Sequence, residues 1–320
     1  MLKCIYNLRK VLNYNLFNFK HKYINYNLKL LIFIISCLVF IFKKKIKIAL
    51  CTMGKNENLY VNEFINYYIN LGVNRIFIYD DNDINDEKLS DAISNSNKKY
   101  VKVYQNIKKR IKNQSDSFTE CYNNNKKKYD WFLMFHMDEF LFIVKDTLNK
   151  YLSNPSFKKC DFIKLHLVTS HGNNLLYYDN RTLMERFKGP YKKTKYIKTI
   201  VKGNINKLIY WVHSPKQSPE RKITCNNVGE KLKAHNIRKE SIKKINIKKA
   251  YIIHFRFKST EEFIKKYKRG YRNWFGDKLQ KYLKSSIDSY LRNSLVTKQK
   301  LEYLERELHL NLSVYKLLIK

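Results

Sequence analysis

Acidic side chains follow three stretches of apolar, strand-forming residues in this chain, at the point where each stretch ends. The polar segments are Asn56-Glu57, Asp80-Asp81 and His136-Met137-Asp138-Glu139. A carboxylate at the edge of an apolar strand is unfavourable unless it pairs with a cation or another partner. Because the carboxyl ends of parallel strands meet at one rim of an open α/β sheet, we expect the three segments to face one crevice.

A divalent metal ion would explain acidic groups at that crevice. Mg²⁺ or Mn²⁺ held by a carboxylate bridges two phosphates and stabilises a diphosphate leaving group by neutralising its charge. Asp138 is the best ligand candidate, and His136 is a second candidate because Mn²⁺ accepts imidazole better than Mg²⁺ does. The alternative is a strand end at which ordinary acidic residues are simply solvated.

Strands and helices alternate through the first half of the domain. The hydrophobic pattern predicts strands at 46–51, 75–79, 100–104 and 131–135, separated by helices at 56–71, 86–94 and 116–127. Asn56 is expected to cap the first helix and Gly72 to end it. Nearly unbroken apolar strands are typical of burial on both faces, so the predicted fold class is α/β, a mostly parallel sheet flanked by helices.

The second half is less regular. Residues 161–254 carry further strand-like stretches, which we expect to extend the sheet and shape an acceptor site. Ser259 and Glu262 form the pattern of a capping box, and the chain is predicted to be helical from there to its end.

The composition of the chain excludes few classes of function. The formal net charge of +37 would suit nucleic acid or an anionic membrane. Lysine is over-used along the whole chain, however, and no nucleic-acid-binding motif accompanies it, so no nucleic-acid partner is expected. The six cysteines lack metal-ligand spacing and C-x-x-C pairs, which indicates neither a zinc module nor a disulfide scaffold.

The N-terminus predicts a membrane anchor. Residues 1–29 read as a polar tail, and 30–44 as an uncharged apolar run with a basic flank. The run is short for a bilayer, and a cleaved signal peptide or a buried helix are the alternatives. The prediction is a single-pass membrane protein, with a type II arrangement in a secretory-pathway membrane considered. Lysines flank both ends, so the orientation stays open.

Motifs in order along residues 45–272 resemble glycosyltransferase family 92 and its family 2-like relatives. They comprise Ile48–Glu57, Phe64–Val73 with Ile76–Asp80, the Asp-x-Asp-Glu-Phe-like segment at Trp131–Phe142, Glu185-Arg186-Phe187, and His254–Ser259 with Glu262-Phe263. Each motif alone is weak, but their order and spacing are specific. Residues 273–320 would be a helical extension beyond the glycosyltransferase domain.

The resemblance implies a GT-A fold, a nucleotide-sugar donor and Mn²⁺ or Mg²⁺. It implies that Asn56, Glu57 and Asp80, with Asp81, meet the donor nucleoside. It also implies that Asp138 holds the metal and diphosphate, that Glu139 orients the turn or the donor sugar, and that His254 is a later ligand. Lys258 could then neutralise charge on the leaving group. A plain core histidine is the alternative for His254.

The function implied is transfer of a hexose, with a UDP-sugar as the expected donor, to a glycan, protein or lipid acceptor. Glu185 and His171 are candidates for the base that deprotonates the acceptor hydroxyl, although Glu185 could instead pair with Arg186 or Arg181. His136 stands where the family pattern has its first aspartate. This change leaves a second hypothesis open, a catalytically inactive protein that binds nucleotide sugars or glycans on the same fold.

Overall fold

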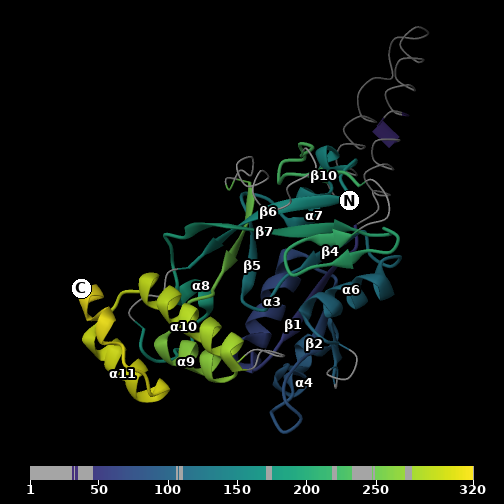
Figure 1. Cartoon of the computed structure of the whole chain (residues 1–320). Coiled ribbons are helices and arrows are strands. Elements are labelled where there is room, and N and C mark those ends of the chain that lie inside the picture. Colours follow the sequence, from purple (N-terminus) through teal and green to yellow (C-terminus); the bar gives the residue numbers. More distant parts are fainter. Residues whose placement is uncertain are drawn as a thin grey trace, which may run out of the picture. The chain divides into compact units, whose positions relative to one another are not determined.

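The computed structural model describes residues 31, 33–34, 46–105, 107, 111–170, 175–217, 222–232, 247, 249–270 and 276–319 (Figure 1). The chain divides into two compact units, Met1–Lys45 and Ile46–Lys320. No helix of the described residues is long and apolar enough to cross a membrane. The predicted anchor lies outside the described part of the chain except for Leu31, Phe33 and Ile34.

Nine strands form one mixed sheet within the described part of Ile46–Lys320. They are β1 (Ile48–Gly54), β2 (Arg75–Asp80), β3 (Val101–Tyr104), β4 (Trp131–Met134), β5 (Glu139–Ile143), β6 (Phe162–Thr169), β7 (Lys192–Lys202), β10 (Thr224–Cys225) and β11 (Ala250–His254). The order is β3-β2-β1-β4-β7-β6-β11-β5, with β10 pairing the start of β6. A separate hairpin consists of β8 (Ile209–Tyr210) and β9 (Pro215–Gln217).

The sheet is parallel in the half predicted by the βα alternation and mixed in the other half. Strands β3, β2, β1 and β4 are parallel neighbours. In the second half β7 runs antiparallel to both β4 and β6, and β5 runs antiparallel to β11. The expected α/β sheet with flanking helices is therefore present, but it is mixed.

Helices cover the sheet and continue beyond it (Figure 1). The α-helices are α3 (Val61–Leu71), α4 (Leu89–Ala92), α5 (Asn95–Lys98), α6 (Gln114–Asn125), α7 (Leu148–Leu152), α8 (Leu183–Arg186), α9 (Thr260–Lys268), α10 (Gly276–Arg292) and α11 (Lys298–Leu308). Short 3₁₀ helices lie at η1 (Asn58–Tyr60), η3 (Pro155–Phe157) and η5 (Ser313–Leu318).

Alternate residues of β1 enter two separate apolar clusters, one on each face of the sheet. Ile48 and Leu50 pack in the cluster that contains α3, whereas Ala49 and Cys51 pack in the cluster that contains α6. This is the period-two geometry of a strand buried on both faces. The first helix begins later than predicted, after η1, and Gly72 ends it with a positive φ of 112°.

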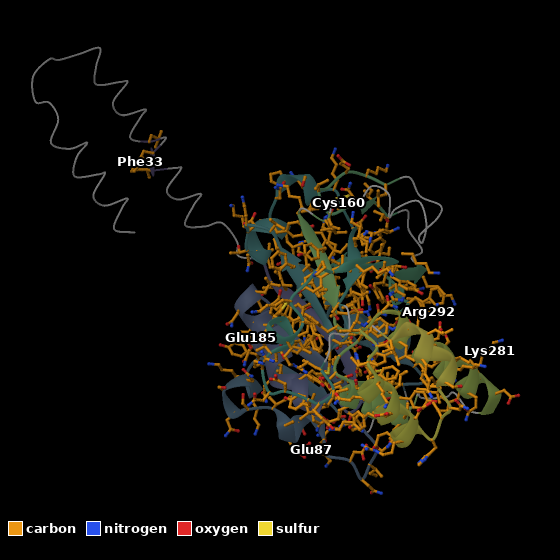
Figure 2. The ribbon with its side chains drawn as sticks, turned by 90° about the vertical axis from the view of Figure 1, so that its left-hand side faces the viewer. Phe33, Glu87, Cys160, Glu185, Lys281 and Arg292 are labelled. Carbon is orange, nitrogen blue, oxygen red and sulfur yellow. A yellow bond between two sulfur atoms is a disulfide. The ribbon has the colours of Figure 1, made fainter. Side chains whose placement is uncertain are left out.

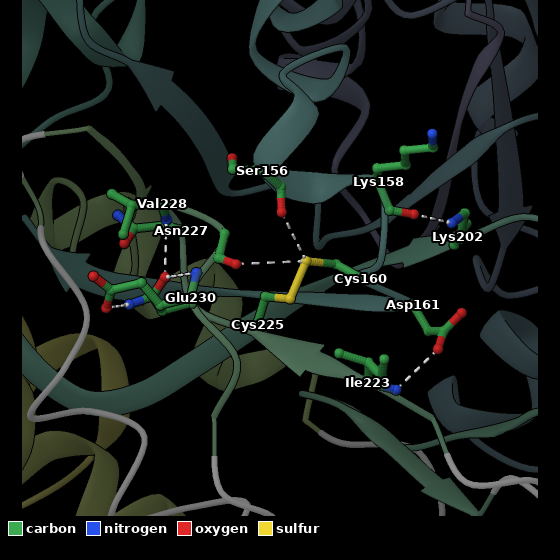
Figure 3. The surroundings of a disulfide bond; sticks show 12 residues. Ser156, Lys158, Cys160, Asp161, Lys202, Ile223, Cys225, Asn227, Val228 and Glu230 are labelled. Atoms are coloured by element: carbon green, nitrogen blue, oxygen red, sulfur yellow. Dashed lines mark hydrogen bonds between the residues drawn. A yellow bond between two sulfur atoms is a disulfide. The ribbon is translucent and has the colours of Figure 1, made fainter.

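Two disulfides cross-link the fold, contrary to the expectation from cysteine spacing. Cys51 of β1 is bonded to Cys121 of α6. Cys160, just before β6, is bonded to Cys225 of β10 (Figure 3). The partners are 70 and 65 residues apart in the chain. Only the folded sheet brings such distant residues together, so local spacing carried no signal for either pair.

The C-terminal helices form a third apolar cluster. The predicted capping box is confirmed at the start of α9, where the Ser259 side chain accepts from the Glu262 backbone and Glu262 accepts from that of Ser259. Phe263 of α9 stacks on Tyr290 of α10 with 4.1 Å between ring centroids. On the outer side of α10, Lys281 is exposed and extends away from the fold (Figure 2).

Candidate functional site

The turn between β4 and β5 brings three predicted metal ligands together. His136 and Asp138 lie in this turn, and His254 ends β11, where it pairs with Glu139 of β5. One ligand atom each from His136, Asp138 and His254 lie within 4.8 Å of one another. The residues come from positions far apart in sequence, and the sheet order is what makes them neighbours.

Asp138 is buried beside two basic side chains. Its Oδ2 lies 3.0 Å from Lys266 Nζ of α9 and 3.3 Å from His254 Nε2. Burial raises the pKa of Asp138, but Lys266 and His254 outweigh this effect and hold the pKa well below its usual value. A backbone hydrogen bond also holds the turn in place, because the Phe255 N–H, just after β11, donates to the Asp138 carbonyl at 2.8 Å. Asp138 is therefore an ionised carboxylate in a fixed position.

The Glu139 carboxylate contacts both the backbone and the side chain of His136. Its Oε2 accepts from the His136 backbone N–H at 2.8 Å, and its Oε1 lies 3.5 Å from His136 Nδ1. The fully buried Lys198 of β7 places its ammonium 3.0 Å from Glu139 Oε2. Burial, and then the charge of Lys198, hold the pKa of His136 well below its usual value, so its imidazole is neutral near pH 7.

This arrangement fits a divalent cation. The buried His136 Nε2 has no hydrogen-bond partner among the described residues, and a neutral imidazole with a proton on Nδ1 would offer a lone pair there. Two imidazole nitrogens and one carboxylate form a donor set that suits Mn²⁺ better than Mg²⁺. Lys266 is partly exposed and competes for Asp138, so a bound cation requires this side chain to move aside.

Glu57 lies in a second cluster of charges beside the first. Lys258 Nζ is 3.5 Å from Glu57 Oε2, and Arg269 donates to Glu57 Oε1 at 2.9 Å. Arg269 also donates to the Lys55 carbonyl. Burial raises the pKa of Glu57, but Lys258 and Arg269 prevail and lower it. Glu57, Lys258 and Arg269 line a cleft of about 350 Å³ that also includes Asn56 and Lys266.

The acids after β2 have different roles. Asp80 accepts from the backbone N–H groups of Asn82 at 3.0 Å and Leu89 at 2.9 Å, which organises the loop before α4. Burial raises the pKa of Asp80 despite these bonds. Asp81 instead lines a cleft of about 660 Å³ that also includes His136.

The Glu-Arg-Phe motif contributes its arginine rather than its glutamate to this region. Arg186 forms a buried bidentate ion pair with Glu262, in which its two terminal nitrogens donate to the carboxylate oxygens at 2.8 and 3.1 Å. The Tyr60 hydroxyl donates to the same carboxylate. Glu185 is exposed and caps its own short helix by accepting from Thr182 (Figure 2). The other candidate base, His171, lies outside the described residues.

Gly54, at the end of β1, lets the turn between β4 and β5 pack closely. A Cβ atom at this position would come within 2.4 Å of the Met137 sulfur and 3.0 Å of Leu89. Met137 lies between His136 and Asp138 in the turn and is buried. The close approach of β1 therefore sets the position of the turn that carries two of the three candidate ligands.

Sequence reasoning missed several charged residues of the site. Lys198, Lys266 and Arg269 are ordinary members of a lysine-rich chain until the fold turns them inward. The spacing of Glu262, Lys266 and Arg269 places them on one side of α9, and this helical period was the one signal available.

Comparison of this sequence with known families identifies the family. The model of glycosyltransferase family 92 matches residues 44–291, which is most of the chain and includes every element that builds the site. The chain belongs to glycosyltransferase family 92.

Curated relatives carry the same family name. The chain is 27% identical over 146 residues to a glycosyltransferase family 92 protein of Ricinus communis, covering 46% of this chain and 24% of that protein. It is 29% identical over 117 residues to one of Oryza sativa subsp. japonica, covering 36% and 20%, and 32% identical over 98 residues to one of Arabidopsis thaliana, covering 31% and 17%. The matched region spans about a quarter or less of these relatives.

Proposed function

We propose that this protein is a metal-assisted glycosyltransferase that moves a hexose from a nucleotide sugar, with a UDP-sugar as the expected donor, to a glycan, protein or lipid acceptor. Family membership supports the reaction class. The observation that carries the proposal is the convergence of His136, Asp138 and His254 within 4.8 Å at the carboxyl ends of the strands. This is the rim at which open α/β sheets bind their ligands.

Each side chain has a defined task in this proposal. His136, Asp138 and His254 would hold Mn²⁺, which neutralises charge on a diphosphate. Lys258 and Lys266, both close to that cluster, stabilise the negative charge that develops on the leaving group. Glu57, Asp80 and Asp81 lie where the nucleoside is expected, with Asp80 acting through the loop that it organises rather than by direct contact.

The proposed setting is an oxidising compartment. Disulfides persist in secretory and extracellular compartments and are rare in the cytosol. The two cross-links of the Ile46–Lys320 unit match a luminal catalytic domain, held by the apolar run at 30–42 as a single-pass anchor.

A thermal-shift screen of nucleotide sugars with and without Mn²⁺ tests the function. A donor at about 100 times its Kd stabilises the folded protein by about 2.7 kcal/mol, and the shift should require the metal. Asp138→Asn should lose it, whereas Asp146→Asn, at a carboxylate paired with Lys150 elsewhere, should keep it. Turnover of the stabilising donor is then measured. No metal-dependent shift with any nucleotide sugar would contradict the proposal.

A second candidate is a protein that binds nucleotide sugars without a metal. It is favoured by the ammonium of Lys266, which already neutralises Asp138 at 3.0 Å. In this case the donor shift would survive a chelator and would be lost in Lys266→Met instead. The same screen therefore separates the two candidates.

A further inference from the structure

The turn of the β8–β9 hairpin holds an exposed tryptophan in the larger cleft. Trp211 is 45% exposed and lines the cleft of about 660 Å³ that also contains His136. Its backbone N–H donates to the Ser214 carbonyl at 2.8 Å and closes the turn. A large, rigid, partly apolar ring at the wall of a cleft with both polar and apolar lining offers contact area at a low cost in side-chain entropy.

The support of Trp211 is rigid although its side chain is exposed. Buried Lys198 donates to the carbonyl of Val212 at 3.0 Å, and Thr199 donates to that of His213 at 3.1 Å. Both donors lie on β7, in the centre of the sheet. The hairpin thus presents its indole from a fixed backbone, which reduces the entropy lost when a ligand binds.

The same lysine places the hairpin beside the turn between β4 and β5. Lys198 Nζ lies 3.0 Å from the Val212 carbonyl and 3.0 Å from Glu139 Oε2, and this carboxylate oxygen also accepts from the His136 backbone. One ammonium therefore joins the residue after Trp211 to the turn that carries the candidate metal ligands. A ligand stacked on Trp211 would lie close to the reacting groups.

The chemistry around Trp211 fits a sugar ring. Asn113, Gln114 and Lys216 line the same cleft and place amide and ammonium groups around the indole. A pyranose has an apolar face of C–H groups and a rim of hydroxyls, so it can stack on the indole while its hydroxyls bond to the rim. A lipid chain would instead require a continuous apolar surface.

We propose that Trp211 is the stacking platform for a sugar residue of the acceptor, which makes the acceptor a glycan. This inference rests on the proposed function, which assigns the donor nucleoside to the ends of β1 and β2. Lys55 and Asp81, from those ends, line another part of the same cleft. The hairpin wall is then left for the group that receives the sugar.

The test is binding of short neutral oligosaccharides to the full chain by calorimetry, with a panel of glucose, mannose, galactose and N-acetylglucosamine oligomers. Trp211→Ala should weaken binding of the oligosaccharide that the wild type binds by at least about tenfold, or ~1.4 kcal/mol. Trp211→Phe should retain part of the affinity because it keeps an aromatic face. Tyr177→Ala, at an aromatic residue that is 61% exposed outside this cleft, should change nothing.

The second part of the test measures the affinity of the wild type and of Trp211→Ala for UDP in the presence of Mn²⁺. Trp211→Ala should leave UDP affinity unchanged. A tenfold loss of UDP affinity with unchanged oligosaccharide binding would assign Trp211 to the donor and overturn the proposal, as would a wild type that binds no member of the panel. Failure of the proposed function has a different signature, because the wild type itself would then show no metal-dependent binding of nucleotide.

Discussion

Asp80 ends β2 and Asp138 follows β4, the two strands that flank β1. Both side chains are buried, yet their surroundings differ in kind. Asp80 accepts from backbone N–H groups within its own loop. Asp138 faces the side chains of Lys266 and His254, which come from other parts of the chain. Backbone partners cannot leave without unfolding the loop, whereas a lysine side chain can swing away. The loop after β2 is thus a structural element, and the turn after β4 can exchange its partners for a ligand.

The largest effect on metal affinity and sugar transfer is expected for Asp138→Asn. Loss of the carboxylate removes the anionic member of the candidate ligand set, so Mn²⁺ affinity and sugar transfer should both fall at least about 100-fold, equivalent to ~2.7 kcal/mol. Calorimetric titration of Mn²⁺ and donor turnover measure the two effects. Unchanged Mn²⁺ affinity in this variant would contradict the assignment of the turn after β4 as the metal-binding segment and would leave it no different from the loop after β2.

Lys198→Met is expected to have the next largest effect on metal affinity, together with a loss of stability. It leaves the buried Glu139 carboxylate without its cation, which costs roughly 3–5 kcal/mol in the free energy of unfolding. Support of His136 is lost at the same time, and Mn²⁺ affinity should fall by about tenfold or more. Chemical denaturation measures the first effect and calorimetry the second.

The double variant Lys198→Met with Glu139→Gln is the control for that prediction. It replaces both charges and should recover part of the stability, because no unpaired charge remains buried. It should not recover Mn²⁺ affinity if Glu139 orients His136. A double variant as unstable as the single one would show that lost packing, rather than the unpaired carboxylate, explains the damage.

Asp80→Asn should show the opposite pattern to Asp138→Asn. One of the two backbone N–H groups loses its acceptor, and the free energy of unfolding should fall by about 1–3 kcal/mol. Mn²⁺ affinity, measured well below the melting temperature, should stay within twofold of the wild type. A large loss of metal affinity with intact stability would place Asp80 in the ligand set and erase the contrast.

The smallest and most diagnostic effect is the pH dependence of these differences. The pKa of Asp80 is raised by burial, so its contribution to stability is present below its unfolded pKa of about 3.9 and is lost as the pH rises through its folded pKa. The pKa of Asp138 is depressed by Lys266 and His254 despite burial, so its contribution is present above about pH 4 and is lost on acidification.

Denaturation of the wild type and the two asparagine variants across pH 3–7 tests this contrast. The stability advantage of the wild type over Asp80→Asn should shrink as the pH rises above about 4, and its advantage over Asp138→Asn should shrink below about pH 4. Parallel curves for the two variants would mean that the two carboxylates titrate alike.

The sequence predicted what local periodicity and strand order determine. The β1–α3–β2 unit, the stop at Gly72 and the capping box of α9 depend on residues close in the chain. Asp138 was identified because an acid at the end of an apolar strand requires a partner. The family resemblance was confirmed by the match over residues 44–291. The roles assigned to individual site residues remain predictions for the experiments above.

Long-range partners could not be read from the sequence. Lys266 is 128 residues from Asp138, and Arg269 is 212 residues from Glu57. In a chain with 64 lysines and arginines, nothing local marks the few that turn inward. The disulfides and the antiparallel placement of β7 have the same cause, because each depends on which strands become neighbours in the sheet.

Gly54 has a consequence for how inherited variation in this protein should be interpreted. A change to alanine adds one methyl group and no charge, and conventional severity scales would class it as mild. The added carbon would collide with the Met137 sulfur, however, and Met137 would have to shift. Such a shift would alter the distance between His136 and Asp138, the neighbours of Met137 in the turn. Loss of activity can therefore arise from a position that carries no side chain of its own, and a survey limited to polar residues would overlook it.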